Sequence, residues 1–373
     1  MEQKTIVVVD AMGGDNAPVE IVKGAVDAVN KSDKVQVILT GIEDVVRAEL
    51  KKYTYPEDRI SVLHASEVIT TEEAPAFAIK KKKDSSNVVS QKQLKTGEAD
   101  AFVSAGSTGA VLVGGTLVAG RIRGIERTPL GTLIPTEKGV ALLVDSGANA
   151  DCRPSHLVQF AQMGSIYMEH VIGIKNPRVA LVNIGVEEEK GNALVKETLP
   201  LLKECKNINF TGSIESREIP HGGADVIVCD GFTGNVILKL YEGVASALMH
   251  QIKGGLMSSL RSKIGALLIK PALKQVLKKF DASEYGGAPM LGLNGLVVKT
   301  HGSATAAEVS NSILQCITFK EQGINDKIRT LLGRDAKKKA AEKAAETTEK
   351  AEKTAKKAEN TEKTADQAEK TEA

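Results

Sequence analysis

Residues 5–18 read TIVVVDAMGGDNAP, an apolar run that stops at Asp10 and gives way to a turn rich in glycine. The run Thr5–Val9 is almost continuously apolar, which is typical of a strand covered on both faces. The residues that follow, Val19–Val29, have the apolar spacing of a helix. A buried strand, a polar turn and a helix in this order indicate an α/β fold.

The same unit recurs along most of the chain. Further strands are predicted at Val35–Thr40, Ile60–Leu63, Ala101–Ser104, Ala141–Asp145, Val179–Ile184, Val226–Cys229 and Leu296–Thr300. Helical patterns lie between them, among others at Pro154–Val171, Ala193–Lys203 and Asn235–Gln251. This alternation favours a three-layer αβα fold with a mostly parallel sheet. We expect one folded body over residues 1–334.

The composition argues against several classes of protein. Of the 373 residues, 49 are Lys or Arg and 47 are Asp or Glu, and only 3% are aromatic. A net charge of +2 with few stacking side chains argues against a nucleic-acid binder. The four cysteines are scattered, and a chain of this length needs no disulfides. Because the first apolar run is also too short for a signal peptide, we expect a cytoplasmic protein.

Two segments depart from the strand–helix pattern. Ala101–Gly120 has no charged residue and approaches membrane-spanning length, but its glycines predict a buried strand, a turn and a buried helix. The last 38 residues, Ala336–Ala373, contain no Ile, Leu, Val or Phe and cannot enter a core. We therefore expect the folded body to end near Gly333, and residues 335–373 to be a solvated helix or a disordered tail.

Two loops that follow predicted strands suit an anionic ligand. Ligands of open α/β sheets bind beyond the carboxyl ends of the strands. In the first loop paired glycines let the backbone approach a ligand, and in the second a helix start offers free N–H groups to phosphate. Each loop is also compatible with a plain capped turn. The candidate residues are Asp10, Gly13, Gly14 and Asp15 in the first loop, and Ser107, Thr108 and Gly109 in the second.

Four further loops carry polar side chains. Lys190 stands in an acidic stretch that is typical of a solvated face, yet it could reach a substrate anion. Asp230 and Asn235 flank two glycines directly after a predicted strand, which favours a functional role over a simple connection. Asn149 lies in the loop after another strand and is a candidate for substrate binding. His301 leads into Gly302-Ser303, where a structural cap and a catalytic role are both open.

Familiar catalytic arrangements are absent from the sequence. No Ser-His-Asp pattern and no metal-ligand spacing of His, Cys and carboxylates is evident. Cys229 adjoins Asp230, whose charge disfavours a thiolate, so we interpret Cys229 as a small buried residue. We expect no metal.

Together, the six loops and the motif Tyr285-Gly286-Gly287, which precedes His301 in the chain, resemble the bacterial fatty acyl-ACP:phosphate acyltransferases of phospholipid synthesis. The resemblance covers Lys4 to about Gly333. It implies transfer of a fatty acyl group from acyl carrier protein to inorganic phosphate, for use by a membrane-embedded glycerol-3-phosphate acyltransferase. It also implies a homodimer, no cofactor, and a fold similar to phosphotransacetylases and isopropylmalate-type dehydrogenases. Many members carry His where this chain has Asn16, so no base is assigned there.

The chemistry implied by this resemblance needs few special groups. Phosphate is already a nucleophile and a thiolate is a good leaving group, so positioning and charge stabilisation suffice. On this hypothesis Ser107–Gly109 cradle phosphate, and Lys190 neutralises phosphate or the developing oxyanion. Asp230 and Asn235 orient the nucleophile or the pantetheine arm. His301 is a weaker candidate for an acid or base.

The segment Gly255–Phe280 differs from the core. Apolar residues recur on one helical face before and after Lys270-Pro271, with six basic residues and no acid. Such a stripe suits peripheral contact with an anionic membrane, and the resemblance implies a protruding helical pair. A hairpin packed on the body or on a dimer partner is the alternative. We predict that Leu267, Leu268 and Ile269 form the exposed tip and contact the membrane.

Other functions are weighed against this one. His301-Gly302-Ser303-Ala304 is similar to a dehydrogenase cofactor loop, although the metal-binding Asp pair and the Arg cluster of a decarboxylating dehydrogenase are not evident. A short-chain phosphotransacylase is another enzyme of the same fold. A non-enzymatic adaptor at the membrane surface would not need six loops of this kind.

Overall fold

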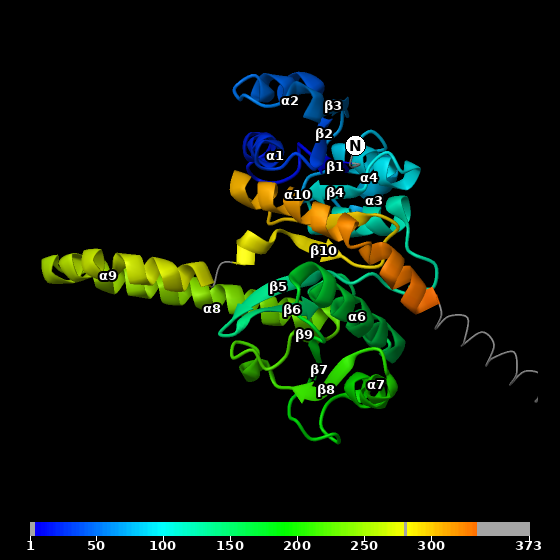
Figure 1. Cartoon of the computed structure of the whole chain (residues 1–373), viewed down its shortest axis with the longest axis vertical. Helices are drawn as coiled ribbons and strands as arrows, with labels where there is room; N and C mark the ends of the chain where they lie inside the picture. The colour runs from blue at the N-terminus through cyan, green and yellow to red at the C-terminus, as the bar shows by residue number, and fades with distance from the viewer. Residues whose placement is uncertain (1–3, 280–281, 334–373) are drawn as a thin grey trace, which may run out of the picture.

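The computed structural model describes residues 4–279 and 282–333, which form two lobes with one sheet each (Figure 1). The first lobe has the strand order β10-β11-β4-β1-β2-β3, and the second has the order β5-β6-β9-β7-β8. Neighbouring strands are parallel except in the pairs β10–β11 and β5–β6. The predicted α/β fold with mostly parallel strands is confirmed, with the strands divided between two sheets.

The two sheets meet at their antiparallel edges. An isolated antiparallel bridge joins Leu130 to Met290, next to β5 and β10. The strands of the first sheet are β1 (Thr5–Asp10), β2 (Val35–Gly41), β3 (Ile60–His64), β4 (Ala101–Ser104), β10 (Ala288–Met290) and β11 (Leu296–Lys299). Those of the second sheet are β5 (Gly131–Thr136), β6 (Gly139–Val144), β7 (Arg178–Val182), β8 (Asn209–Ile214) and β9 (Val226–Val228).

Helices cover both faces of each sheet. In β1, Val7 and Val9 join the core beneath α1 and α10, whereas Val8 joins a second cluster with residues of α4 and α5. This alternation explains why the β1 sequence is apolar at every position from Ile6 to Val9. The helices of the body are α1 (Val19–Lys31), α2 (Glu43–Leu50), α3 (Pro75–Lys81), α4 (Ser86–Thr96), α5 (Thr108–Gly114), α6 (Pro154–Tyr167), α7 (Ala193–Glu204) and α10 (Ala306–Glu321).

Three strands escape the sequence prediction, and each lies at the edge of a sheet. β5 contains Pro135, β10 contains Pro289 and β8 contains Gly212. Proline and glycine weaken a strand pattern, yet an edge strand tolerates them because one side of its backbone needs no partner. The continuous apolar runs of the inner strands therefore predict the centre of each sheet better than its margins.

The two longest helices of the described chain form a hairpin that projects from the body (Figure 1). α8 (Gly231–Met257) and α9 (Leu260–Lys279) are joined at Ser258-Ser259. The Ser259 hydroxyl accepts a hydrogen bond from the Ser262 N–H at 3.1 Å, so it caps the start of α9. The expected tip at Leu267–Ile269 is wrong: these residues lie within α9, which continues through Pro271.

Other expectations can be compared with the described residues. Ala101–Gly120 contains β4, a turn and α5, as predicted, and no helix of the described chain is long and apolar enough to cross a membrane. Residues 324–333 are helical and bury Ile324, Ile328 and Leu332, and the end of the folded body near Gly333 stays a prediction. The predicted tail at 335–373 lies outside the described residues.

Candidate active site

The loops after β1 and β4 are joined through a buried carboxylate. Asp10 is only 2% exposed, and its Oδ2 accepts a hydrogen bond from the Ser104 hydroxyl at 2.9 Å. The Ser104 oxygen in turn accepts one from the Gly106 N–H at 3.0 Å. Burial raises the pKa of Asp10, against the opposing effect of hydrogen bonds that include those from Ser86 and Ser104. The loop that precedes α5 is thus tied to the end of β1.

Two predicted glycines are needed for this close approach. A Cβ on Gly13 would lie 2.5 Å from Asp10 Oδ2 and 2.9 Å from the Gly106 nitrogen. Gly14 has a φ of +105°, and a Cβ there would lie 2.7 Å from the Ala105 Cβ. The paired glycines noted in the sequence after this strand are therefore needed because a larger side chain at either position would clash with neighbouring atoms.

A third loop, after β11, completes what we call the first-lobe cluster, which comprises residues 10–16, 104–109 and 299–304. The Asp15 N–H donates to the Gly302 carbonyl at 2.8 Å, and the Asn16 side chain donates to the Ser303 carbonyl at 3.0 Å. His301 is exposed, and its Nδ1 lies 2.8 Å from the Ser303 hydroxyl. Three of the six predicted loops thus lie together.

The predicted phosphate loop begins α5. The Ser107 hydroxyl accepts a 3.5 Å hydrogen bond from the Ala110 N–H and so caps this helix, while Thr108 is exposed. A Cβ on Gly109 would lie 2.5 Å from Pro75, so this glycine is required by packing against α3. Ser107 and Thr108 are the members of the predicted trio whose side chains a ligand could reach.

Lys299 was missed by the sequence analysis. It ends β11 opposite Ser104, is 8% exposed, and its Nζ donates to the carbonyls of Ala105 (3.3 Å) and Thr300. Burial lowers its pKa to about 8, although the nearby Asp10 and Asp15 oppose the shift. A lysine at the end of an apolar strand is a detectable signal, but its burial is not.

In the second lobe the loop after β6 is organised by Asp145. This carboxylate is fully buried, and burial raises its pKa despite several hydrogen bonds. The donors to it are the N–H groups of Leu130, Gly147, Ala148 and Asn149 and the Asn149 side-chain amide. Asn149 also donates to the Thr128 carbonyl at 3.0 Å, so its amide has structural partners, and substrate binding by Asn149 stays a prediction.

Asp230 caps α8. Its Oδ1 accepts from the Thr233 N–H at 2.9 Å and its Oδ2 from the Thr233 hydroxyl at 2.8 Å. The Gly231 N–H donates to the Asn149 carbonyl at 2.7 Å, which joins this loop to the loop after β6. Asn235 is exposed on the first turns of α8, near Gly147. Cys229, just before the cap, is buried, as interpreted from the sequence.

Lys190 lies in the loop between β7 and α7. Its Nζ pairs with Glu187 Oε1 at 2.8 Å, and this hydrogen bond raises the pKa of Lys190. The side chain is 45% exposed, so the ammonium is charged at neutral pH and open to solvent. The Asn183 side chain donates to the Lys190 carbonyl at 3.2 Å and holds the loop against the end of β7.

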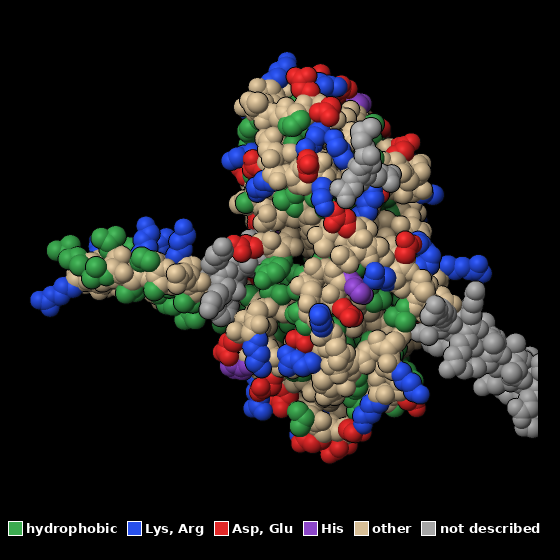
Figure 2. All heavy atoms as spheres, in the orientation of Figure 1, with side chains coloured by type: hydrophobic (Ala, Val, Ile, Leu, Met, Phe, Trp, Pro, Cys, Tyr) green, Lys and Arg blue, Asp and Glu red, His purple; other side chains and the backbone are tan. Residues whose placement is uncertain are grey.

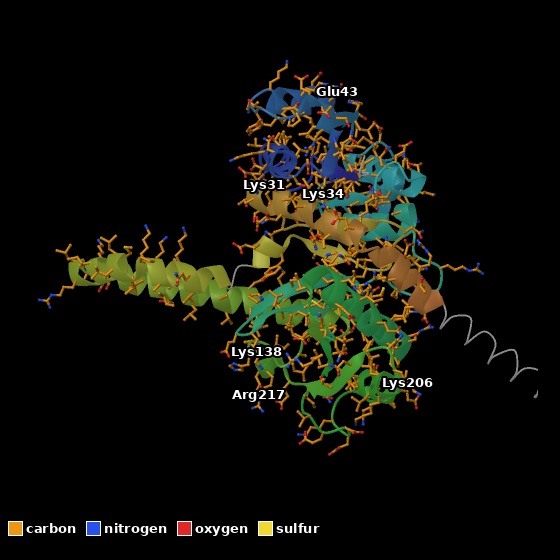
Figure 3. All side chains as sticks on the ribbon, in the orientation of Figure 1. Lys31, Lys34, Glu43, Lys138, Lys206 and Arg217 are labelled. Atoms are coloured by element: carbon orange, nitrogen blue, oxygen red, sulfur yellow. The ribbon has the colours of Figure 1, made fainter. Side chains whose placement is uncertain are left out.

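A cavity of about 910 Å³ lies at the carboxyl ends of β7 and β9. Asp230 lines it, as do Asn183, Gly191 and Asn192 from the loop that carries Lys190. Arg217, labelled in Figure 3, stands at the rim on the second lobe. The structure therefore brings Asp230 and the Lys190 loop to one cavity, which their separation in the sequence did not reveal.

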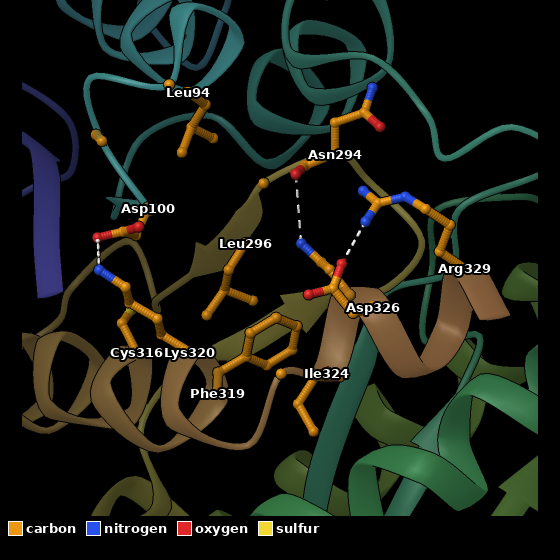
Figure 4. Close-up of a pocket in the computed structure, with 15 residues that line it drawn as sticks. Leu94, Asp100, Asn294, Leu296, Cys316, Phe319, Lys320, Ile324, Asp326 and Arg329 are labelled. Carbon is orange, nitrogen blue, oxygen red and sulfur yellow. Dashed lines mark hydrogen bonds and ion pairs between the residues drawn. The ribbon is translucent and has the colours of Figure 1, made fainter.

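A smaller pocket of about 300 Å³ lies at the opposite edge of the first sheet, beside the amino ends of β4 and β11 (Figure 4). Its charged side chains pair with one another, Asp100 with Lys320 at 2.7 Å and Asp326 with Arg329. None of the predicted site residues lines it. Among residues 4–279 and 282–333, no three His, Cys, Asp or Glu side chains form a group that could hold a metal ion.

Comparison with known proteins shows the family of the chain. Residues 5–327 match the family described as "Fatty acid synthesis protein". The chain belongs to this family. Similar members are the phosphate acyltransferases of Alkaliphilus oremlandii, 53% identical over 86% of this chain and 96% of that protein, and of Clostridium novyi, 50% identical over 87% and 97%. The predicted resemblance is confirmed, and this member of the family is an acyltransferase.

Two solved structures have a fold similar to that of this chain. A phosphotransacetylase from Streptococcus pyogenes aligns with a TM-score of 0.59 at 17% identity, over 85% of this chain and 94% of that chain. A phosphotransacetylase from Staphylococcus aureus aligns with a TM-score of 0.55 at 17% identity, over 86% and 94%. The predicted likeness of fold to phosphotransacetylases is confirmed.

Proposed function

We propose that this acyltransferase moves a fatty acyl group from acyl carrier protein to inorganic phosphate and so supplies acyl phosphate for phospholipid synthesis. The observation that carries the proposal is the placement of Asp230 and the Lys190 loop on one large, mainly apolar cavity. An apolar cavity with a few polar groups suits a lipid-like acyl donor, and an exposed ammonium suits an anionic acceptor. The names of the relatives support the same chemistry.

The reaction needs one new bond and one broken bond. A phosphate oxygen attacks the thioester carbonyl carbon, and the tetrahedral intermediate collapses with cleavage of the C–S bond and protonation of the thiolate. We assign Ser107 and Thr108 to phosphate, and Lys190 to the charge on phosphate or on the oxyanion. Asp230 and Asn235 position the reactants from the start of α8. His301 is a candidate proton donor to the leaving thiolate.

Acyl phosphate formation tests the proposed reaction directly. The full chain is mixed with palmitoyl-ACP and phosphate, and acyl phosphate is trapped with hydroxylamine. We expect hydroxamate only when phosphate is present, and unchanged yield after treatment with EDTA, because no metal or cofactor is proposed. A strict requirement for a divalent ion or a nucleotide would contradict the proposal, and oxidation of a hydroxy acid with a nicotinamide cofactor would favour the dehydrogenase.

We further propose that the α8–α9 hairpin contacts an anionic membrane, where the membrane-embedded glycerol-3-phosphate acyltransferase would receive the product. Leu267 is 70% exposed and Leu268 76% exposed, so neither packs on the body of the same chain. Figure 2 shows hydrophobic and basic side chains together on the hairpin. Buried Leu side chains contribute roughly 1.5–3 kcal/mol each, and basic residues about 1 kcal/mol each, at such a surface.

The change Leu268→Glu tests this contact. Because Leu268 is exposed, the variant should fold, lose sedimentation with anionic vesicles and keep its turnover in vesicle-free assays. Gln275→Glu is the matched control, since it places the same charge on an exposed position of α9 without removing an apolar side chain. Vesicle binding that survives in Leu268→Glu would point to another surface. Light scattering of the unmodified chain tests the proposed homodimer.

A further inference from the structure

Lys299 is a buried cation in the first-lobe cluster, and the proposed reaction gives it no role. The preceding residues of β11, Leu296–Val298, are buried and apolar, and Lys299 itself is only 8% exposed. Its Nζ donates to the Ala105 carbonyl at 3.3 Å and to the Thr300 carbonyl. One ammonium thus ties the loop after β4 to the loop after β11.

The two carbonyls belong to loops that carry groups assigned to the reaction. Ala105 lies two residues before Ser107, and Thr300 directly precedes His301. Because Lys299 is buried and its donors already meet backbone carbonyls, it acts on a ligand through these loops and through its charge rather than by direct contact.

The charged groups that face Lys299 include two carboxylates. Asp10 faces it from the end of β1 and Asp15 from the loop that follows, while Lys239 faces it from α8. Lys239 pairs with Glu242 at 2.8 Å, so these two charges balance each other. Without Lys299 the first-lobe cluster would therefore present two carboxylates to an incoming anion and no cation of its own.

The other elements packed on β11 carry few charges. β4, β10 and α5 contain no charged residue. The charged side chains of α10 have partners of their own, namely Glu308 with the Thr305 cap, Lys320 with Asp100 and Glu321 with Lys34. The local balance of charge is therefore set by Lys299 and the two carboxylates.

We propose that Lys299 is a positioning residue through which the first-lobe cluster accepts phosphate. Its ammonium fixes the loops after β4 and β11 relative to each other, and its charge offsets one of the two carboxylates, so that a phosphate anion is less strongly repelled. The inference rests on the proposed function, which assigns phosphate to Ser107 and Thr108. It adds the residue that sets the affinity for phosphate without touching phosphate.

The charge of Lys299 can be removed without changing the chain. Burial lowers the pKa of Lys299 to about 8, although Asp10 and Asp15 oppose the shift. Mild base therefore converts the ammonium into a neutral amine, which still has N–H donors for the carbonyls of Ala105 and Thr300. A role in loop packing alone would survive this change, whereas a role that needs the charge would be lost.

The test measures the binding of inorganic phosphate to the full chain by calorimetry at pH 7 and pH 9.5. At pH 7, Lys299→Met should bind phosphate about tenfold more weakly than the unmodified protein. At pH 9.5 the two dissociation constants should agree within about twofold, because residue 299 is then uncharged in both proteins. Comparing the two proteins at the same pH cancels the titration of phosphate itself.

Lys23→Met is the matched control, since Lys23 is an exposed lysine on α1 of the same lobe. It should bind phosphate within about twofold of the unmodified protein at both pH values. If Lys299→Met does not fold, as judged by circular dichroism, Lys299→Gln takes its place, because it removes the charge and keeps an N–H donor. Steady-state kinetics at pH 7 should show a KM for phosphate raised about tenfold and a KM for palmitoyl-ACP within about twofold of the unmodified value.

Three results would overturn the proposal. The first is unchanged phosphate affinity in the folded Lys299 variant at pH 7, and the second is no binding of phosphate to the unmodified protein. The third is a loss of affinity of the same size at both pH values, which would assign Lys299 to loop packing alone. If phosphate binds as expected but no acyl phosphate forms with palmitoyl-ACP, the proposed function fails and the role of Lys299 in binding the anion stands.

Discussion

The two lobes place polar loops at the carboxyl edge of a sheet but use them in opposite ways. In the first lobe the loops close on one another, because Gly13 and Gly14 allow backbone and carboxylate to approach within van der Waals distance. In the second lobe the loop after β7 carries Ile184 and the first turn of α8 carries Phe232, and a cavity of about 910 Å³ remains between them. Parallel strands bring loops to one edge of the sheet, but side-chain size decides whether these loops pack against one another or leave a cavity.

The largest effect, on turnover, is expected from substitutions in the second lobe. Lys190→Ala should lower kcat by roughly 10²–10³-fold, the range found when one group that stabilises a developing charge is removed. Asp230→Ala should lower kcat by roughly 10²-fold, because Asp230 is assigned to positioning the reactants. Acyl phosphate production measures the effect, with circular dichroism to confirm folding. Lys196→Ala, on an exposed position of α7, is the control and should keep its activity. Near-normal turnover in both site variants would remove the assigned roles.

In the first lobe we expect an effect of the buried Lys299 on the pH dependence of the free energy of unfolding. Burial lowers the pKa of Lys299 from 10.5 to about 8. Below pH 8 this lysine is protonated in both states and the cost of its burial is fully present. Between pH 8 and 10.5 the unfolded chain binds more protons, so the free energy of unfolding rises with pH, by up to ~3 kcal/mol from this group.

Lys299→Met should remove that rise. Urea unfolding at pH 8 and pH 10 measures it, as the difference between the variant and the unmodified protein. The same change at the exposed Lys263 is the control and should leave the rise in place. An equal gain in Lys299→Met and in the unmodified protein would show that Lys299 keeps its proton in the folded state.

A smaller effect tests the steric closure of the first-lobe cluster. Gly13→Ala should destabilise the protein by roughly 1–3 kcal/mol, because the new Cβ would lie 2.5 Å from Asp10 Oδ2. Gly265→Ala, in α9, meets no atom within 4 Å and should stabilise its helix by up to about 1 kcal/mol. Thermal unfolding of both variants gives the comparison, and equal melting temperatures would refute the proposed crowding at Gly13.

The smallest effect is expected from the end of the chain. Removal of residues 334–373 should leave melting temperature and turnover of both lobes unchanged, since the segment contains no large apolar residue to withdraw from the core. Calorimetry and the hydroxylamine assay measure the two quantities. A fall of several degrees would mean that the segment docks on one of the lobes.

The sequence by itself determined the local units of this protein. Apolar runs such as Val7–Val9 predict inner strands because both faces are covered, and the loops after them carry the family resemblance that the comparisons confirm. Local patterns also allowed a capped helix start in the loop at Ser107, since short polar side chains satisfy free N–H groups at helix starts. The cap at Asp230 was not predicted, because the helix was expected to begin at Asn235. The inner strands and the start at Ser107 depend on neighbours in the sequence, and that is why they could be read from it.

Tertiary structure alone decided the rest. Which segments meet in space decides the burial of Lys299 and the edge strands β5, β8 and β10. The turn at Ser258-Ser259 depends on where the helical segment breaks, since Pro271 offered a second possible break. The cavity depends most on which segments meet, because its wall combines residues from β7, α7 and α8 that are far apart in the chain. Periodicity reports which face of an element is apolar, whereas packing decides what that face encloses.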